Sequence, residues 1–502
     1  MDRPISSRVN RRDFLKLSAA GGIGAMLAGC ATVPAGPASR LPVLRFQRSP
    51  SDMVRIGMIG LGGKGTGEVA EVLKQKQARI VALCDVDTDH IASNKASLEK
   101  KGVKDLATYT DARKLLENPD VDAIIISTPN HWHTLLAIWG AQAGKHVYVE
   151  KPVSYNLFES RQLAIAATHY GRIIQGGTQN RSDVGLIPGL TKLRAGALGK
   201  IKRVTGITYR YRTSIGRATG PCEIPKGVDF DLWCGPAPKV VPRRKKFHYD
   251  WHYFWANGGG DISNQGPHEL DLVRWALGEP EAPRRVITMG GRFLWNDDGE
   301  APNSAMVVYD FPGVEVVFDV RNLAMKPGVD ETAAFKNLRT GIYVECEHGA
   351  FAGGRGGGRF LDLDGKVIEK FPGDGGANHL SNFLEVVRHG DPSKLRAPMR
   401  ISTASAALSH FATVAYRAGQ HLGSDAAKEM IKGNSAANEL YERFMDNLKV
   451  DGWDEKNEPL TVGGWLDWDE SKFQFTGGTN HEAANAMITR DYRAPFVVPD
   501  LA

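Results

Sequence analysis

Near its amino end the chain reads Met53-Val-Arg-Ile-Gly-Met-Ile-Gly60-Leu-Gly62-Gly63-Lys64-Gly65, and this stretch decides the fold. The apolar residues up to Ile59 predict a buried β-strand, and a short glycine-rich turn then leads into a predicted helix. Gly60, Gly62 and Gly65 stand in the G-x-G-x-x-G register of a dinucleotide-binding fold. The stretch therefore predicts a phosphate-binding loop in a parallel α/β domain.

Each glycine of this loop has its own physical role. Gly60 permits a tight turn, and Gly65 lets the helix pack closely on the strand. Gly62 and the adjacent Gly63 let backbone amides approach a pyrophosphate, which the amino end of the helix would face. Glycine-rich loops alone are a weak signal in a chain with 56 glycines, so the interpretation depends on the residues that follow.

The next predicted strand, residues 79–84, ends at Asp85, which is 25 residues after Gly60. A carboxylate at this point accepts hydrogen bonds from the adenosine ribose hydroxyls and repels a 2′-phosphate. The alternative is an ordinary surface carboxylate at a strand end. The sequence thus predicts a nucleotide cofactor and favours NAD over NADP.

Strand and helix patterns alternate from Met53 to about residue 180, which predicts a doubly wound parallel sheet. Ligands of such sheets bind outside the carboxyl ends of the strands. Two more strand ends fall there, because the run 121–126 precedes Thr128-Pro-Asn-His131 and the run 145–149 precedes Glu150-Lys151-Pro152. The predicted cofactor-binding residues are Gly60, Gly62, Gly63, Gly65, Asp85, Thr128, Asn130, His131, Glu150 and Lys151.

Beyond about residue 180, strand-like runs follow one another with few helices between them. This pattern predicts a second, α+β domain with a large, mostly antiparallel open sheet and helices on one face. The aromatic, Gly- and Pro-containing tail favours an irregular wrap over the surface. The expected units are a Rossmann domain at 51–180, a substrate and oligomerisation domain at 181–450, and a C-terminal wrap at 451–502.

Residues 1–30 have the pattern of an export signal, with the twin arginines Arg11-Arg12 before Asp-Phe-Leu-Lys. Leu27-Ala-Gly-Cys30 resembles a lipoprotein cleavage box, so a lipid anchor at Cys30 in the periplasm or cell envelope is expected. An ordinary signal cut elsewhere is the alternative. Residues 31–50 are rich in Pro, Ala, Gly and Ser and predict a flexible linker.

The charge composition argues against a nucleic-acid-binding protein. The 63 basic residues nearly balance the 57 acidic ones, and a net charge of +6 gives no support for nucleic-acid binding. Cys222 and Cys234 could pair across a short loop in an oxidising compartment, but sequence leaves this open. No metal site is expected, because His131 and His133 lack a neighbouring cysteine or carboxylate cluster and nothing supports His252 with His268 as ligands.

Taken together, these motifs resemble the glucose-fructose oxidoreductase, inositol dehydrogenase and rhizopine-catabolism (Gfo/Idh/MocA) family over about residues 53–425. The resemblance rests on the glycine loop, Thr128 to His133, Glu150-Lys151-Pro152, and a glycine run before His268 and Asp271. It implies a Rossmann domain plus an α/β domain whose open sheet mediates homo-oligomers. It also implies NAD(P)-dependent chemistry on sugars, inositols or related polyols.

Oxidation of a carbinol needs a proton acceptor near the hydroxyl and a cation that stabilises alkoxide character. Lys151 suits the cation, as the lysine of this motif is thought to do in the family, and His268 suits the acid/base. A solvated lysine and a histidine that caps a helix are the plain alternatives. The substrate candidates are Asn264, Arg181, Tyr209 and Trp251, with Gln179 and His252 as further possibilities.

Asn264 departs from the family, because many members carry an aspartate four residues before the histidine. An amide orients a hydroxyl but takes no proton, so the substrate and the proton route stay open. Two other functions remain, an NAD-dependent glycoside hydrolase that works by transient oxidation and a non-catalytic carbohydrate-binding lipoprotein. Because twin-arginine export moves folded proteins, the cofactor is expected to be loaded before export and retained.

Overall fold

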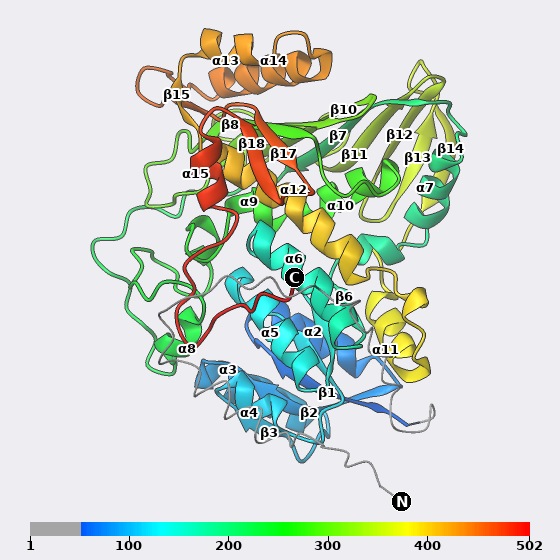
Figure 1. Cartoon of the computed structure of the whole chain (residues 1–502), viewed down its shortest axis with the longest axis vertical. Helices are drawn as coiled ribbons and strands as arrows, with labels where there is room; N and C mark the ends of the chain where they lie inside the picture. The colour runs from blue at the N-terminus through cyan, green and yellow to red at the C-terminus, as the bar shows by residue number, and fades with distance from the viewer. Residues whose placement is uncertain (1–51) are drawn as a thin grey trace, which may run out of the picture.

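A computed structural model describes residues 52–502 of the chain (Figure 1). The predicted export signal, the lipid anchor at Cys30 and the linker at 31–50 lie outside these described residues. Among residues 52–502, no helix combines the length and the apolar character that a membrane crossing requires.

The first sheet is a Rossmann sheet, as predicted. Its six strands are all parallel, in the order β3-β2-β1-β4-β5-β6. The strands are β1 (Val54–Ile59), β2 (Ala78–Cys84), β3 (Ala107–Tyr109), β4 (Ala123–Ile126), β5 (His146–Val149) and β6 (Ile174–Gly176). The helices between them are α2 (Gly63–Leu73), α3 (Thr88–Lys100), α4 (Ala112–Leu116), α5 (His133–Gln142) and α6 (Leu157–His169). Every residue of β1 is buried, because helices cover both faces of the sheet.

The second sheet has 12 strands and is mostly antiparallel, also as predicted. Only its central pair, β7 and β10, is parallel. The order along the sheet is β14-β13-β12-β11-β7-β10-β9-β8-β16-β15, and β17 joins β8 and β18. The strands are β7 (Ile201–Tyr209), β8 (Arg285–Gly291), β9 (Ser304–Phe311), β10 (Val314–Arg321), β11 (Thr340–Cys346), β12 (Gly349–Gly354), β13 (Gly357–Leu361), β14 (Val367–Pro372), β15 (Gln420–Leu422), β16 (Leu460–Val462), β17 (Leu466–Asp469) and β18 (Gln474–Gly478).

Helices cover both faces of part of this sheet, so the expectation of helices on one face was wrong. In Figure 1, α13 and α14 lie above the sheet, while α9, α10 and α12 lie between it and the Rossmann domain. Successive residues of β8 point to opposite faces of the sheet and both faces are covered. Val286 belongs to the same hydrophobic cluster as Leu408 of α12, and Ile287 belongs to the same cluster as Leu440 of α14. The helices of this domain are α7 (Leu186–Arg194), α8 (Phe230–Cys234), α9 (Gly260–Asn264), α10 (Gly266–Ala276), α11 (His379–His389), α12 (Met399–Arg417), α13 (Ser424–Met430), α14 (Ser435–Val450) and α15 (His481–Ala486).

The tail after residue 451 is not an irregular wrap throughout. It adds β16, β17 and β18 to the second sheet and then forms α15, because its apolar residues pack in the sheet cores. Residues 487–502 form no helix or strand. They run back along the Rossmann domain (Figure 1), where Phe496 packs edge-on against Trp132.

The boundary expected at residue 180 is not a clean division of the chain. Helix α11 comes from the second half, yet Phe383 and Leu384 pack on the Rossmann strands β1 and β4. Next to it, the His379 ring hydrogen-bonds the Gly176 carbonyl over 2.8 Å. These contacts fasten the two sheets together, so that loops of the second domain reach the crevice of the first.

Candidate active site

A cavity of about 440 Å³ lies at the carboxyl ends of β1, β2, β4 and β5. This volume is within the usual range for small-molecule and cofactor sites. The predicted site residues that line it are Gly60, Gly62, Gly63, Asp85, Thr128, Asn130, Glu150, Lys151, Trp251 and Asn264. The segment 232–264 of the second domain supplies the facing wall.

The glycine loop has the geometry of a phosphate cradle. Gly60 has φ +85°, in the left-handed region that favours glycine. A Cβ on Gly65 would lie 1.9 Å from the Gly60 carbonyl oxygen, so α2 can approach β1 only with glycine there. A Cβ on Gly63 would meet nothing within 4 Å. No side chain caps α2 at Gly62, so the first-turn amides of α2 face open space and can bind an anion.

Asp85 points its carboxylate at this loop. Its Oδ2 accepts a hydrogen bond of 2.6 Å from the Leu61 amide, and its Oδ1 accepts one of 2.9 Å from the Asp87 amide. A carboxylate accepts about four hydrogen bonds, so Asp85 can also accept from a diol. Asp85 is thus held where ribose hydroxyls can reach it.

Two hydroxyl groups at the cavity support the fit of a dinucleotide. The Oγ atom of Ser127 and the Oγ1 atom of Thr128 are buried and have no protein partner, although both residues line the cavity. Buried hydroxyls without a partner are costly, and a ligand rich in oxygen atoms would satisfy them. With the glycine loop and Asp85, they form a site that fits a pyrophosphate-linked dinucleotide.

Lys151 lies at the far end of the cavity and is held by Asn264. Its Nζ donates to the Asn264 carbonyl over 2.7 Å and to the Asn264 Oδ1 over 3.3 Å. The Asn264 amide is fixed in turn, because its Nδ2 donates to Asp261 Oδ1 over 3.1 Å. Burial lowers the pKa of Lys151. Lys151 keeps one more donor for a bound hydroxyl.

Asp261 supplies a buried carboxylate one helical turn before Asn264, but it does not act as a free base. Arg212 donates to both of its oxygens, at 3.0 and 3.2 Å, and Asn322 Nδ2 donates over 2.6 Å. Burial alone would raise the pKa of Asp261, yet the Arg212 hydrogen bonds and charge lower it overall. The carboxylate therefore serves to orient the Asn264 amide.

His268 is half-buried on the first turn of α10. Burial lowers its pKa well below the usual value, and the positive charge of Lys151 is the next cause. The ring is therefore neutral at physiological pH and can accept a proton. His268 does not line the cavity, although it stands only four residues after Asn264, which does.

Glu269, next in the chain, is buried, and burial raises its pKa to about 8. The pKa of this carboxyl is higher in the folded protein than in the unfolded chain. Its contribution to stability is therefore fully present below the unfolded-state pKa and is lost as the pH rises through the folded-state pKa. We expect Glu269→Gln to remove this dependence. Between pH 6 and pH 9 the free energy of unfolding of the wild type should fall by about 2 kcal/mol more than that of the variant. Urea unfolding of both proteins at both pH values measures this difference, and an equal change in the two proteins would contradict the prediction.

Five of the predicted residues do not line the cavity: Gly65, His131, Arg181, Tyr209 and His268. Arg181 is buried, with Nε 2.7 Å from Asp271 Oδ2 and a second ion pair to Glu279, so its charge is structural. Tyr209 is also buried and hydrogen-bonds Asp319 on the other face of the second sheet. Both assignments to the substrate were wrong, because a long side chain on a sheet or helix edge gives no signal of which face it occupies.

His131 lies behind the cavity wall instead of bordering the cofactor site. It is completely buried, and its Nε2 donates to the Trp233 carbonyl over 3.0 Å, which leaves Nδ1 to accept from Asn257 Nδ2 at 3.3 Å. Burial lowers the pKa of His131 to about 3, so the ring stays neutral. It packs the loop that carries Asn130.

Sequence reasoning missed several residues of the facing wall. His90, Trp233 and His248 line the cavity, and so does His252, which was only one possibility among several. His252 is 4% exposed and its Nε2 has no protein partner. Burial lowers the pKa of His252 to about 4. Only His90 could have been found from spacing, because it follows Asp85 by five residues, in the first turn of α3.

The thiols of Cys222 and Cys234 are both free, so the possible disulfide is not formed. Cys234 is buried, and burial raises its pKa to about 11. These thiols pack with Trp233 and Phe247 in a small cluster beneath the facing wall.

The fold and the cavity define an oxidoreductase of the NAD-binding Rossmann class. The sequence matches the oxidoreductase family with an NAD-binding Rossmann fold over residues 54–178, and the C-terminal alpha/beta domain of that family over residues 193–321. The chain belongs to the Gfo/Idh/MocA oxidoreductase family.

Similar proteins bear different names. A "Glycosyl hydrolase family 109 protein" of Shewanella pealeana is 34% identical over 169 residues, which are 32% of this chain and 37% of that protein. A 1-carboxy-3-chloro-3,4-dihydroxycyclohexa-1,5-diene dehydrogenase of Comamonas testosteroni is 25% identical over 262 residues, 50% of this chain and 57% of that protein. The chain thus spans less than two thirds of the length of each of these relatives.

Among solved structures, the WlbA dehydrogenase of Bordetella pertussis, in complex with NADH and UDP-GlcNAcA, has a similar fold. The TM-score is 0.53 at 19% identity, with 71% of this chain and 94% of that chain covered. This likeness concerns the fold.

Proposed function

We propose that the protein is an NAD-dependent oxidoreductase that oxidises or reduces one carbinol of a sugar, inositol or related polyol. The observation that carries the proposal is the pairing of a cofactor cavity with Lys151 and His268. Lys151 lines the cavity and binds Asn264, and His268 follows Asn264 by four residues, on the first turn of α10. A binding protein would need neither a poised cation nor a neutral histidine at this point.

The residues of this chain divide the work of alcohol oxidation. Lys151 donates a hydrogen bond to the substrate hydroxyl and stabilises the negative charge that develops on oxygen. His268 accepts the hydroxyl proton, which its neutral ring allows. Asn264 fixes the direction of the Lys151 ammonium group through two contacts. A bound NAD supplies the hydride acceptor, and the orphan hydroxyls of Ser127 and Thr128 with the glycine loop would hold it.

NAD is the proposed form of the cofactor. Asp85 places a buried carboxylate beside the loop, where a 2′-phosphate would meet a like charge.

We further propose export through the twin-arginine route with the cofactor already bound, followed by lipid anchoring at Cys30. A cofactor that stays bound must be regenerated in place, so the reaction would be ping-pong or redox-neutral.

A glycoside hydrolase is the second candidate, because relatives that match about a third of this chain are named as glycosyl hydrolases of family 109. Transient oxidation, elimination and re-reduction would leave NAD unchanged and use the same site.

A homo-oligomer is also proposed, since the edge strand β14 exposes Val367 and Ile368, and such edges pair readily.

A panel of free sugars, polyols and glycosides distinguishes these functions. Each compound is incubated with the purified protein, and ketose formation and release of the reducing end are measured in parallel. Ketose without cleavage supports the dehydrogenase, and cleavage without net redox change supports the hydrolase. Binding of a sugar with neither product would support the non-catalytic alternative and contradict the proposal.

A further inference from the structure

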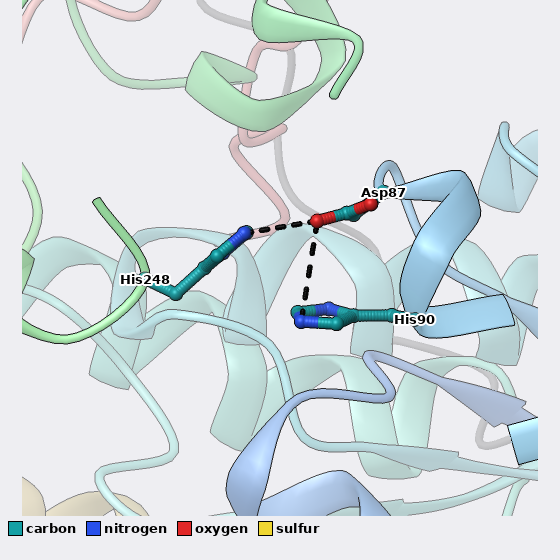
Figure 2. A group of neighbouring side chains, drawn as sticks. All are labelled: Asp87, His90 and His248. Carbon is teal, nitrogen blue, oxygen red and sulfur yellow. Dashed lines mark ion pairs between the residues drawn. The ribbon is translucent and has the colours of Figure 1, made fainter. Parts of the chain in front are cut away.

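Three side chains outside the proposed chemistry converge beside the cofactor cavity, and two of them, His90 and His248, line it. Asp87 and His90 stand at the start of α3 in the Rossmann domain, and His248 comes from the facing wall (Figure 2). Each offers one ligand atom, and the three atoms lie within 4.8 Å of one another. Asp87 and His248 are 161 residues apart in the sequence, so only the fold brings them together.

We propose that Asp87, His90 and His248 bind a divalent transition-metal ion of the zinc type and thereby clamp the facing wall to the Rossmann domain. Two imidazoles and one carboxylate are a common set of protein ligands for zinc, with a water molecule in the fourth position. Harder ions such as Mg²⁺ prefer oxygen ligands, so the two histidines select against them.

The distances fit a tetrahedral site after small side-chain movements. The His248 Nε2 atom is 2.9 Å from Asp87 Oδ2, and the His90 Nε2 atom is 4.0 Å from the same oxygen. Bonds of about 2.1 Å to zinc put neighbouring tetrahedral ligands about 3.4 Å apart, which lies between these two distances. The His90 and His248 rings are 4.6 Å apart between centroids, so both side chains lie on the same side of Asp87 within reach of one ion.

The second nitrogen of His90 has the partner that metal-binding histidines usually have. Its Nδ1 lies 3.4 Å from Asp85 Oδ2 and donates a hydrogen bond to it. This bond fixes the tautomer in which Nε2 carries the free lone pair, and carboxylates that orient ligating histidines in this way raise their affinity for metal. The same carboxylate faces the cofactor cavity, so metal and nucleotide share Asp85.

Asp87 is held rigidly for this role. It is 3% exposed, and its Oδ1 caps α3 by accepting from the Asp89 amide over 2.9 Å, so Oδ2 faces the histidines. The wall is pinned beside it, because the Asp229 amide donates to the Val86 carbonyl over 2.9 Å and the Thr88 amide donates to the Gly227 carbonyl over 3.0 Å. The backbones that carry the ligands are therefore already in place, and the ion would join the facing wall to the Rossmann domain.

The test is a zinc titration of the mature protein, prepared without a histidine tag and dialysed against a chelator, in competition with a chromophoric chelator. We expect one equivalent of zinc per chain in the wild type. His248→Ala and Asp87→Asn should bind about 100-fold more weakly or worse. Asparagine keeps the helix cap at position 87, so the second variant tests the ligand alone. The matched control is His389→Ala, which removes a surface histidine paired with Glu385 at 3.2 Å.

Near-ultraviolet circular dichroism checks that each variant is folded, and Co²⁺ in place of zinc should give the visible absorption of a tetrahedral site in the wild type only. The proposal would be overturned if the wild type bound no zinc, or if His248→Ala bound zinc as tightly as the wild type. Asp87 and His248 would then form only a hydrogen-bonded pair. The titration needs neither nucleotide nor substrate, so its outcome is independent of the proposed function.

Discussion

Replacing Lys151 with alanine is expected to lower kcat/KM by about 10³-fold with the substrate that the panel identifies. The change removes the only cation that the structure holds against Asn264 at the end of the cofactor cavity, among residues 52–502. The transition state would then develop charge on oxygen without a fixed donor. Steady-state kinetics measure the loss, and the nucleotide content of the variant should stay unchanged, because the glycine loop is intact.

His268→Ala should lower kcat/KM by about 10²-fold or more, since the proton acceptor is removed while the cation remains. The matched control for Lys151→Ala is Lys95→Ala, which removes a partly exposed lysine of α3 that pairs with Glu99 over 3.2 Å. Its turnover should equal that of the wild type. Wild-type activity in both Lys151→Ala and His268→Ala would refute the two assignments.

Gly65→Ala is expected to abolish nucleotide binding and to destabilise the protein by about 3 kcal/mol. The new Cβ would lie 1.9 Å from the Gly60 carbonyl oxygen and 2.7 Å from its carbon, both backbone atoms that cannot rotate away. Helix α2 would have to move off the loop, and its first-turn amides would leave the cradle. Nucleotide content after purification and urea unfolding measure the two effects.

The control lies two residues along the same helix. A Cβ on Gly67 would meet nothing within 4 Å, and Gly67 is exposed with an ordinary helical backbone. Gly67→Ala should therefore stabilise the protein by about 0.5–1 kcal/mol and leave nucleotide binding intact. Equal nucleotide content in both variants would show that close packing at Gly65 is not what forms the cradle.

The cofactor side of the site could be predicted because its signals are local. The glycines, Asp85 and Glu150-Lys151 each follow a buried strand directly, and parallel strands bring their carboxyl ends to one edge. No long-range contact had to be known to place them together. The alternation of strands and helices likewise predicts the parallel sheet, while runs of strands predict the antiparallel one.

Apart from Trp251 and Asn264, the facing wall could not be predicted, because its residues are placed by contacts distant in sequence. His248 reaches Asp87 only after the segment 222–249 folds across the crevice. Arg181 looked like a substrate ligand, since nothing in the sequence shows that Asp271 and Glu279 neutralise it. Buried ion pairs and substrate sites use the same residue types, and only packing separates them.

The most direct test of the central claim is to purify the mature protein without added nucleotide, denature it, and identify what is released by absorbance and mass. A cofactor loaded before export and held by the loop, Asp85 and the orphan hydroxyls predicts close to one NAD(H) per chain. Half occupancy at nanomolar free cofactor needs a dissociation constant of about 1 nM, or about −12 kcal/mol. A protein that releases no nucleotide and turns over only with millimolar added NAD would contradict the account.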